Sequence, residues 1–239
     1  MIQTVGLTKY YGNFKALDNV SFEVKDGEIV GLLGLNGAGK TTCLRMLTGY
    51  LIPSEGETII NGRNTFADPL AVKAELGYLP EVPPLYPELT VQDYLQFVAR
   101  LRGIEEERFE DEFLRVTKIA DLTPARRSLI RNLSLGYRKR VGIAQALIGS
   151  PPVLILDEPV SGLDPRQIVE MRKLIRNLAG KHTVLISSHI LTEVSRTCDR
   201  VLVIHKGKLA GELKGQELQD KLEEKFMAMT GSAVTEVGQ

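Results

Sequence analysis

The chain alternates short apolar runs with segments whose apolar residues recur at helical spacing. Runs of four or five apolar residues with turn signals around them are typical of strands buried on both faces of a sheet. Between the second and third runs, residues 165–179 predict a helix with Ile168, Met171 and Ile175 facing inward. This alternation predicts an α/β fold with a mostly parallel sheet as its core. The three runs are Ile29–Leu33, Val153–Leu156 and Thr183–Ile186.

The first 60 residues show a different pattern, in which apolar and polar residues alternate singly. Val20–Val24 alternates strictly, and Asp26–Gly27 then gives a turn signal just before the apolar run at residue 29. Glu57–Ile60 precedes a second turn signal, Asn61–Gly62. We therefore expect an N-terminal antiparallel β-subdomain, followed by a short strand at Glu75–Leu79.

Residues 82–150 are predicted to form a mostly helical insert. It opens with a proline-rich linker, and Thr90 with Asp93 then resembles a capping box at a helix start. Gly103 ends that helix, and the acidic run Glu105–Glu112 is typical of a solvated face of the next one. The second helix carries four apolar residues on one face: Phe109, Phe113, Val116 and Ala120.

After the insert and the alternating segment, Val201–Ile204 and Lys208–Ala210 suggest a closing hairpin. The sequence then predicts a short helix at residues 216–226. The remainder, Met227–Gln239, is small and polar, and we expect a mobile tail.

The composition excludes several classes of protein. Thirty acidic residues balance thirty basic residues in 239, so no global charge favours nucleic acid as a partner. No apolar segment approaches the ~20 residues of a membrane span, and no secretory signal is apparent. The two cysteines, Cys43 and Cys198, lie far apart and predict free thiols in a reducing compartment. We expect a soluble protein that reaches a membrane only through a partner.

The most specific pattern follows the first apolar run and fits G-x-x-x-x-G-K-[ST], the loop that wraps nucleoside triphosphates. Its glycines let backbone N–H groups turn toward an anion at the start of the next helix. Lys40 can reach the β- and γ-phosphates, and the Thr41 hydroxyl suits Mg²⁺. The pattern alone leaves kinases, GTPases, helicases and transporter motors open. Its residues are Gly34, Leu35, Asn36, Gly37, Ala38, Gly39, Lys40, Thr41 and Thr42.

Two further groups follow buried strands, where ligands bind in open α/β sheets. Asp157 is placed to hold Mg²⁺, and Glu158 to polarise a water for attack on the γ-phosphate. His189 follows the strand at Thr183–Ile186 and can donate a hydrogen bond to the γ-phosphate. The other two histidines, His182 and His205, are interpreted as surface residues.

Together these motifs resemble the nucleotide-binding subunit of an ATP-binding cassette (ABC) transporter over residues 2–215. Leu133–Tyr137 resembles the family's signature segment, and residues 138–147 its signature helix. Ser161–Asp164 resembles the D-loop, His189 the switch histidine, and Tyr11 the aromatic that stacks on adenine. The resemblance implies a P-loop NTPase core of RecA-like type, with the helical signature subdomain inserted at about 82–150.

The resemblance also implies a mechanism. Two subunits face each other head to tail, and Ser134 with the Gly136 N–H binds the γ-phosphate of the ATP held opposite. ATP and Mg²⁺ are the implied cofactors, with Thr41, Asp157 and Glu81 near the metal, and a transmembrane permease is the implied partner. The protein would then lie at the cytoplasmic face of the cell membrane, bound there through the permease.

Three positions depart from the usual family pattern. Glu81 stands where the family usually has Gln, which adds a negative charge near the phosphates. Leu135 replaces the first signature Gly and Tyr137 replaces Gln. This form resembles the branch serving type-2 exporters, the polysaccharide, drug and gliding-type systems.

The alternative function is a soluble cassette ATPase of the iron–sulfur assembly type. A kinase or GTPase would leave the signature segment unexplained, and a non-hydrolysing cassette conflicts with the intact Lys40, Asp157, Glu158 and His189. A cluster of basic residues around the signature is interpreted as forming ion pairs at the surface rather than a nucleic-acid site. It comprises Arg126, Arg127, Arg131, Arg138, Lys139 and Arg140.

Overall fold

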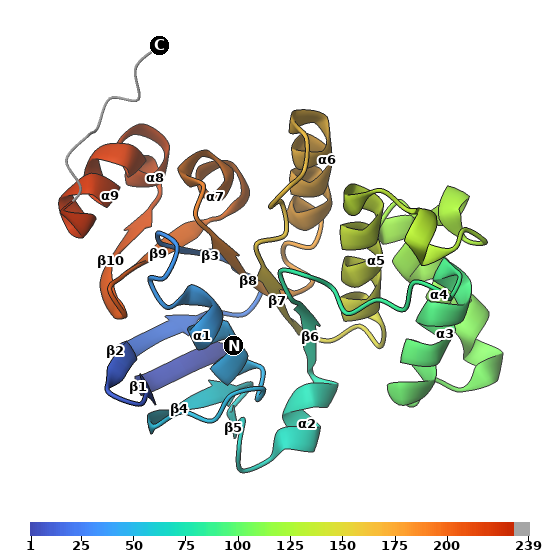
Figure 1. Cartoon of the computed structure of the whole chain (residues 1–239), viewed down its shortest axis with the longest axis horizontal. Coiled ribbons are helices and arrows are strands. Elements are labelled where there is room, and N and C mark those ends of the chain that lie inside the picture. The colour runs from blue at the N-terminus through green and yellow to red at the C-terminus, as the bar shows by residue number, and fades with distance from the viewer. Residues whose placement is uncertain (232–239) are drawn as a thin grey trace.

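The computed structural model describes residues 1–231 and contains two sheets with a helical insert at one side (Figure 1). The larger sheet has the strand order β10-β9-β3-β8-β7-β6, and all pairs except β9–β10 are parallel. This confirms the predicted α/β fold with a mostly parallel core. The strands are β3 (Ile29–Leu33), β6 (Leu76–Leu79), β7 (Val153–Asp157), β8 (Thr183–Ser188), β9 (Arg200–His205) and β10 (Lys208–Lys214).

The smaller sheet is antiparallel, has the order β2-β1-β4-β5, and is built from the N-terminal segment. Helix α1 (Lys40–Leu47) lies between the two sheets, with Cys43, Leu44, Met46 and Leu47 buried. The strands of this sheet are β1 (Ile2–Tyr11), β2 (Phe14–Val24), β4 (Glu55–Ile60) and β5 (Arg63–Asn64).

Strand β3 shows how one short apolar run serves two cores. Val30 and Leu32 pack into the cluster that includes α1 and the antiparallel sheet. Ile29 and Leu33 point to the opposite face and join the cluster formed with the insert and the C-terminal helices. Because side chains alternate along a strand, a continuous apolar run is what a strand buried on both faces requires.

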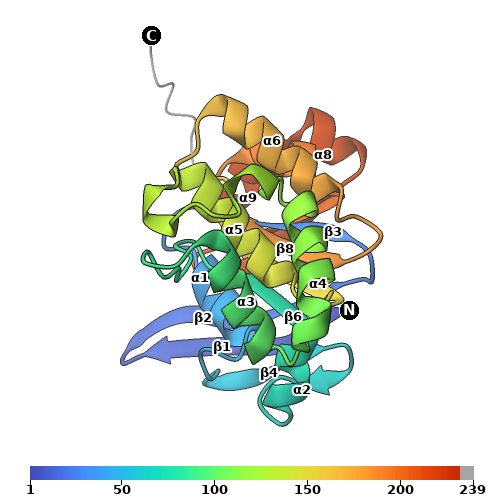
Figure 2. The same cartoon turned by 90° about the vertical axis from the view of Figure 1, so that its right-hand side faces the viewer.

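The insert contains three helices that pack on one another, and α5 also packs on β6; Figure 2 views the molecule from this side. The predicted cap is present, because the Asp93 N–H donates to Thr90 Oγ1 over 3.1 Å. The predicted apolar face, Phe109 to Ala120, is buried. The helices are α3 (Val91–Leu101), α4 (Glu106–Ile119) and α5 (Leu135–Leu147); the short α2 (Pro69–Ala74) precedes β6, and two 3₁₀ turns lie at Thr123–Ala125 and Ile130–Asn132.

The C-terminal part differs from the sequence prediction. Instead of one helix and a tail from Met227, two helices run to Thr230, because Leu218, Leu222 and Phe226 are buried against the core. The rest of the predicted tail, residues 232–239, lies outside the described residues. Four helices accompany the second half of the core sheet: α6 (Pro165–Arg176), α7 (Leu191–Thr197), α8 (Gln216–Asp220) and α9 (Leu222–Thr230).

Across residues 1–231 we find no helix with the length and apolar character that crossing a bilayer requires.

Candidate functional site

The loop between β3 and α1 has the geometry of an anion cradle. Gly37 and Gly39 adopt φ of +79° and +110°, a left-handed region that favours glycine. A Cβ on Gly39 would also lie 2.8 Å from Ala16 O, so the loop passes too close to β2 for any side chain. The sequence motif therefore reflects both the turn itself and its contact with the antiparallel sheet.

Lys40 begins α1 and is only 6% exposed. Its ammonium donates to Gly34 O over 2.7 Å and lies 3.5 Å from Glu158 Oε1. A longer hydrogen bond of 3.4 Å reaches Leu35 O, so the buried charge is held by two loop carbonyls and one carboxylate, which a bound phosphate can replace.

Two carboxylates stand at the end of β7, as predicted. Asp157 is buried and accepts a hydrogen bond from the Ser187 hydroxyl on the neighbouring strand β8. Burial raises the pKa of Asp157, while hydrogen bonds from Ser187 and Thr41 act in the opposite direction. Its contact with Thr41 joins the end of β7 to the start of α1.

Glu158 has a left-handed backbone, with φ of +47°, which is uncommon for a residue with a side chain. Its N–H donates to Ser187 Oγ over 2.9 Å. Its carboxylate lies between an imidazole and an ammonium, because Oε2 is 2.9 Å from His189 Nδ1 while Oε1 faces Lys40. The structure therefore brings together the three residues expected to be catalytic, Lys40, Glu158 and His189.

These groups border an open cavity of about 660 Å³. Tyr11 and Phe14 form its exposed aromatic wall, on either side of the turn between β1 and β2. The sequence prediction missed Phe14, although its position three residues after Tyr11 was a usable signal. The cavity is lined by Tyr11, Phe14, Ala16, Asn36, Gly37, Ala38, Gly39, Lys40, Thr41, Thr42, Glu81, Glu158, Ser161 and His189.

Not every predicted residue lies there. Gly34 and Leu35 do not line the cavity: Gly34 instead accepts the Lys40 hydrogen bond and donates its N–H to Ser188 O over 3.3 Å. Asp157 is one layer deeper than the cavity wall, although its neighbour Glu158 forms part of that wall.

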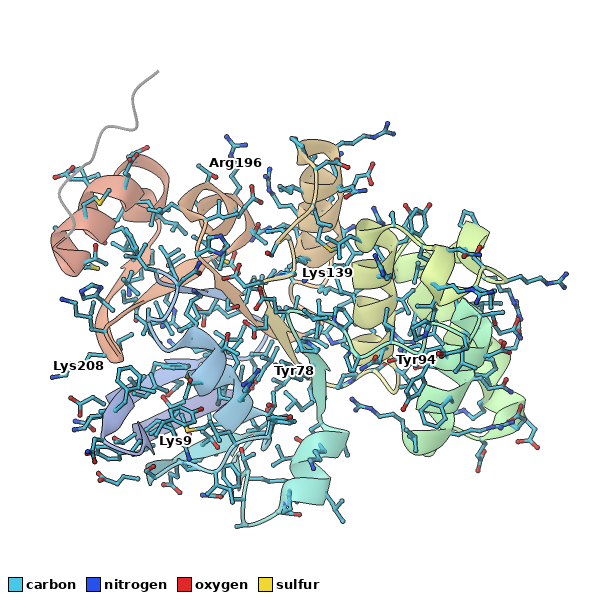
Figure 3. The ribbon with its side chains drawn as sticks, viewed as in Figure 1. Lys9, Tyr78, Tyr94, Lys139, Arg196 and Lys208 are labelled. Atoms are coloured by element: carbon cyan, nitrogen blue, oxygen red, sulfur yellow. The ribbon has the colours of Figure 1, made fainter. Side chains whose placement is uncertain are left out.

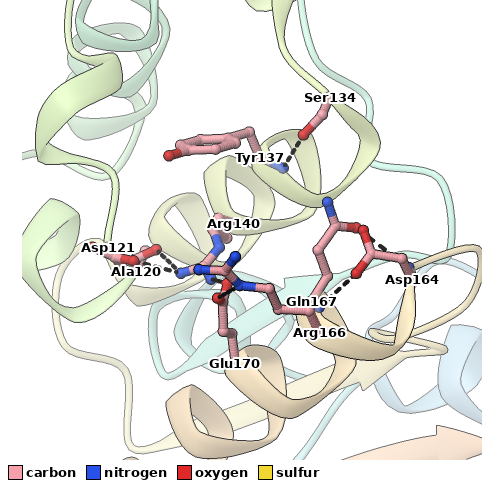
Figure 4. Close-up of polar contacts among 9 residues, drawn as sticks. All are labelled: Ala120, Asp121, Ser134, Tyr137, Arg140, Asp164, Arg166, Gln167 and Glu170. Atoms are coloured by element: carbon pink, nitrogen blue, oxygen red, sulfur yellow. Dashed lines mark hydrogen bonds and ion pairs between the residues drawn. The ribbon is translucent and has the colours of Figure 1, made fainter.

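The signature segment is also outside this cavity. Ser134 caps α5 by accepting the Tyr137 N–H over 3.3 Å (Figure 4). Gly136 borders a separate polar pocket of about 420 Å³, where the Gln167 side chain would meet a Cβ placed on Gly136. Gln167 also completes a capping box with Asp164 at the start of α6. Ser134 is thus exposed and Gly136 buried at a helix start that lies outside the cavity of the chain's own phosphate loop.

Two of the basic residues assigned to surface ion pairs are buried, so the prediction was wrong for them. Arg140 pairs with Glu170 on α6 at 2.8 Å and with Asp121 at 3.3 Å (Figure 4). Lys139 is 2% exposed and donates to Glu81 O and to Glu158 O. Burial lowers the pKa of Lys139, and the charges of nearby carboxylates oppose that change.

A second correction concerns His182, which was expected at the surface. It is buried, and Nδ1 lies 2.7 Å from Pro151 O, where a ring N–H donates to the carbonyl. Burial lowers the pKa of His182. The side chain packs in the interior and does not line the cavity. The two cysteines are free, as expected, and both are buried; burial raises the pKa of Cys43 to about 12.

The donors around Thr41 suit a hard cation that also binds phosphate. Thr41 and Asp157 touch each other, Glu81 borders the same cavity, and all three offer oxygen, the ligand that Mg²⁺ prefers. Within the described part of the chain, no three His, Cys, Asp or Glu side chains converge to hold a metal unaided. The residues therefore fit Mg²⁺ shared with nucleotide phosphates.

Comparison with known proteins agrees with this geometry. Residues 17–161 match the family model described as ABC transporter. The bacitracin transport ATP-binding protein BcrA of Bacillus licheniformis is 42% identical over 223 residues, which cover 92% of this chain and 72% of BcrA.

Two solved structures show the same fold. The ATP-binding cassette MJ0796, solved as a dimer in a post-hydrolysis state with ADP and Pi, superposes with a TM-score of 0.81 at 26% identity. The match covers 90% of this chain and 98% of that one. CbiO1 from Clostridium perfringens, described as part of the ABC transporter complex cbiONQ, gives a TM-score of 0.84 at 26% identity and covers 95% and 94% of the two chains.

Proposed function

The chain belongs to the ABC transporter family, of which it is an ATP-binding and ATP-hydrolysing subunit, and we propose that it works as half of a head-to-tail dimer. One observation carries the proposal: Ser134 and Gly136 both lie outside the cavity of Lys40 and Glu158, and Gly136 borders a separate pocket. A nucleotide in that cavity leaves its own subunit's signature unused. A second cassette, identical or related, would supply the missing half of each site.

Binding would begin with the aromatic wall and the glycine loop. Tyr11 offers a flat apolar face to adenine, and the N–H groups of residues 36–42 surround the phosphates. Lys40 then exchanges its contacts with Gly34 O and Glu158 for the β- and γ-phosphate oxygens. The exchange frees the Glu158 carboxylate only when a triphosphate is present.

Hydrolysis would follow from the freed carboxylate. Glu158 accepts a proton from a water whose oxygen attacks the γ-phosphorus, and the bond from that phosphorus to the ADP oxygen breaks. His189 orients Glu158 through Nδ1, which leaves its Nε2 available to the γ-phosphate. Mg²⁺, held by Thr41 and Asp157 with Glu81 nearby, would neutralise the charge that develops on the phosphate oxygens.

The closed dimer would be the state that ATP stabilises. Ser134 Oγ and the free N–H groups at the start of α5 bind the γ-phosphate presented by the partner. ADP lacks that phosphate, so hydrolysis removes the bond between subunits and the dimer opens.

We propose an export system as the setting. BcrA is a transport ATP-binding protein for bacitracin, and the Leu-Ser-x-Gly-Tyr signature with Glu81 suits the same branch. A transmembrane permease would convert dimer closure into movement of cargo, and the protein would lie on the cytoplasmic face of the membrane beside it. The transport relatives argue against the iron–sulfur assembly alternative.

The test uses Glu158→Gln, which keeps the side-chain shape but cannot accept the proton. With Mg·ATP this variant should elute as a dimer in size exclusion with light scattering, and with Mg·ADP as a monomer. A variant that stays monomeric with ATP, or hydrolyses ATP at the wild-type rate, would contradict the proposal.

A further inference from the structure

Lys139 is a buried ammonium that the mechanism above leaves unused. Lysine is almost never fully buried unless it is paired, yet this side chain is among the most buried in the chain. Figure 3 shows it between α5 and the core sheet. Its position is five residues after Ser134 on the same helix, about 7.5 Å along the axis.

Close packing of α5 brings the ammonium to this place. A Cβ on Gly142, one turn after Lys139, would lie 2.5 Å from Leu79 Cδ1 and 3.2 Å from Pro83. The helix therefore rests directly on the segment after β6, which contains Glu81. Residues at i and i+3 share a helix face, so Lys139 meets the same segment and donates to Glu81 O.

The other contact reaches the catalytic strand end. Lys139 Nζ donates to Glu158 O over 3.0 Å, and the Ser161 N–H donates to the same carbonyl over 3.2 Å. The Glu158 N–H in turn donates to Ser187 Oγ. The backbone N–H and C=O of Glu158 are therefore both hydrogen-bonded, which holds this residue in its left-handed conformation. Lys139 thus fixes the backbone from which the Glu158 carboxylate projects.

A second side of α5 is anchored by the next residue along the helix. Arg140 pairs with Glu170 on α6 and with Asp121 after α4, so the helix is held to the insert and to the core at once (Figure 4). A helix fixed in this way transmits a displacement of its first turn along its length. Lys139 is the residue where such a displacement reaches Glu81 and Glu158.

We propose that Lys139 is a positioning residue that couples the two ATP sites of the dimer. Resting on the head-to-tail arrangement proposed above, the coupling runs from the partner's ATP at Ser134 and Gly136, along α5, to Glu158 and Glu81 of the same subunit. Engagement of the opposite ATP then improves the alignment of each subunit's own Glu158 carboxylate and speeds hydrolysis there.

The test is Lys139→Met, which keeps an unbranched side chain but removes all three donors. We expect the ATPase rate of the wild-type chain to rise with ATP concentration with a Hill coefficient above 1. In the variant the coefficient should fall to about 1 and kcat by about tenfold or more. ATP affinity of the monomer, measured by calorimetry, should stay within twofold.

Two further variants separate positioning from loss of stability. Val116→Ala opens a cavity in α4 without touching a polar contact, and it should lower the melting temperature while leaving the Hill coefficient unchanged. Lys139→Gln keeps an N–H donor on a shorter chain, and it should recover part of both the Hill coefficient and kcat.

The inference is overturned if Lys139→Met retains the wild-type coefficient, if Lys139→Gln recovers none of it, if Val116→Ala loses it equally, or if the wild-type coefficient is 1. The double variant Glu158→Gln/Lys139→Met should still form the ATP-dependent dimer. If Glu158→Gln alone fails to dimerise, the dimer proposal fails. If both dimerise and Lys139→Met stays cooperative, only the role of Lys139 fails.

Discussion

Replacing Lys40 by methionine tests how the phosphate loop distinguishes ATP from ADP. The ammonium already has three partners in the structure: Gly34 O at 2.7 Å, Leu35 O at 3.4 Å and Glu158 Oε1 at 3.5 Å. Nucleotide binding therefore exchanges contacts rather than adding them. A hydrogen bond to a charged group contributes about 1.5–3 kcal/mol, so the net effect of two phosphate contacts should be nearer one such bond than two.

A net loss of about 2–3 kcal/mol corresponds to roughly 30- to 150-fold weaker ATP binding. ADP offers no γ-phosphate, so its affinity should fall by less than about tenfold. Isothermal titration calorimetry with both nucleotides measures the difference, and Lys118→Met on the exposed side of α4 controls for the loss of one positive charge. Equal losses for ATP and ADP, or an ATP loss below threefold, would refute the reasoning.

Three further predictions concern the aromatic wall of the cavity, the buried carboxylate of Asp157 and the two cysteine thiols. Tyr11→Ala should weaken ATP and ADP equally, by about 1–3 kcal/mol for a lost base stack, while Tyr11→Phe keeps affinity in the same titrations; an unequal loss would contradict stacking. Burial raises the pKa of Asp157 above its unfolded value, so the protonated form stabilises the fold, and that stability is lost as pH rises through the raised pKa. Without Mg²⁺, Asp157→Asn should thus have a higher melting temperature than wild type near pH 7, and the difference should narrow toward pH 4. A difference in melting temperature that does not change with pH would contradict this prediction. Cys43 and Cys198 are buried with raised pKa values, so a maleimide should label neither within minutes unless the protein is unfolded, and rapid labelling of the native chain would show that the core is open.

The core and the phosphate loop were predictable because their signals are local. A five-residue apolar run, a glycine loop and a helix lie in order along the chain, and β3 with α1 follows them closely. The carboxylates at the end of β7 and His189 after β8 were placed by a rule of sheet topology, since parallel strands end at one edge.

Burial of charged side chains was not predictable in the same way. Lys139 and Arg140 sit in a basic run, and composition alone favours solvent for such residues. Only the close approach at Gly142 and the carboxylates on neighbouring elements make their burial tolerable. The two helices α8 and α9, by contrast, had a readable signal, because Leu218, Leu222 and Phe226 recur at four-residue spacing.

The central claim is that each ATP site is shared between two subunits. Ser134→Asp keeps an N-cap oxygen for α5 but places a carboxylate against the partner's γ-phosphate, so it should disable the signature without unfolding the helix. Lys40→Met disables the phosphate loop, and neither variant alone should hydrolyse ATP.

Mixing the two variants in equal amounts and measuring ATPase activity decides the matter. A shared site predicts that the mixed dimer regains one intact site, formed by the loop of the Ser134→Asp subunit and the signature of the Lys40→Met subunit. Activity should then exceed the sum of the separate variants several-fold. Activity equal to that sum would contradict the account, because a site contained within one subunit cannot be restored by mixing.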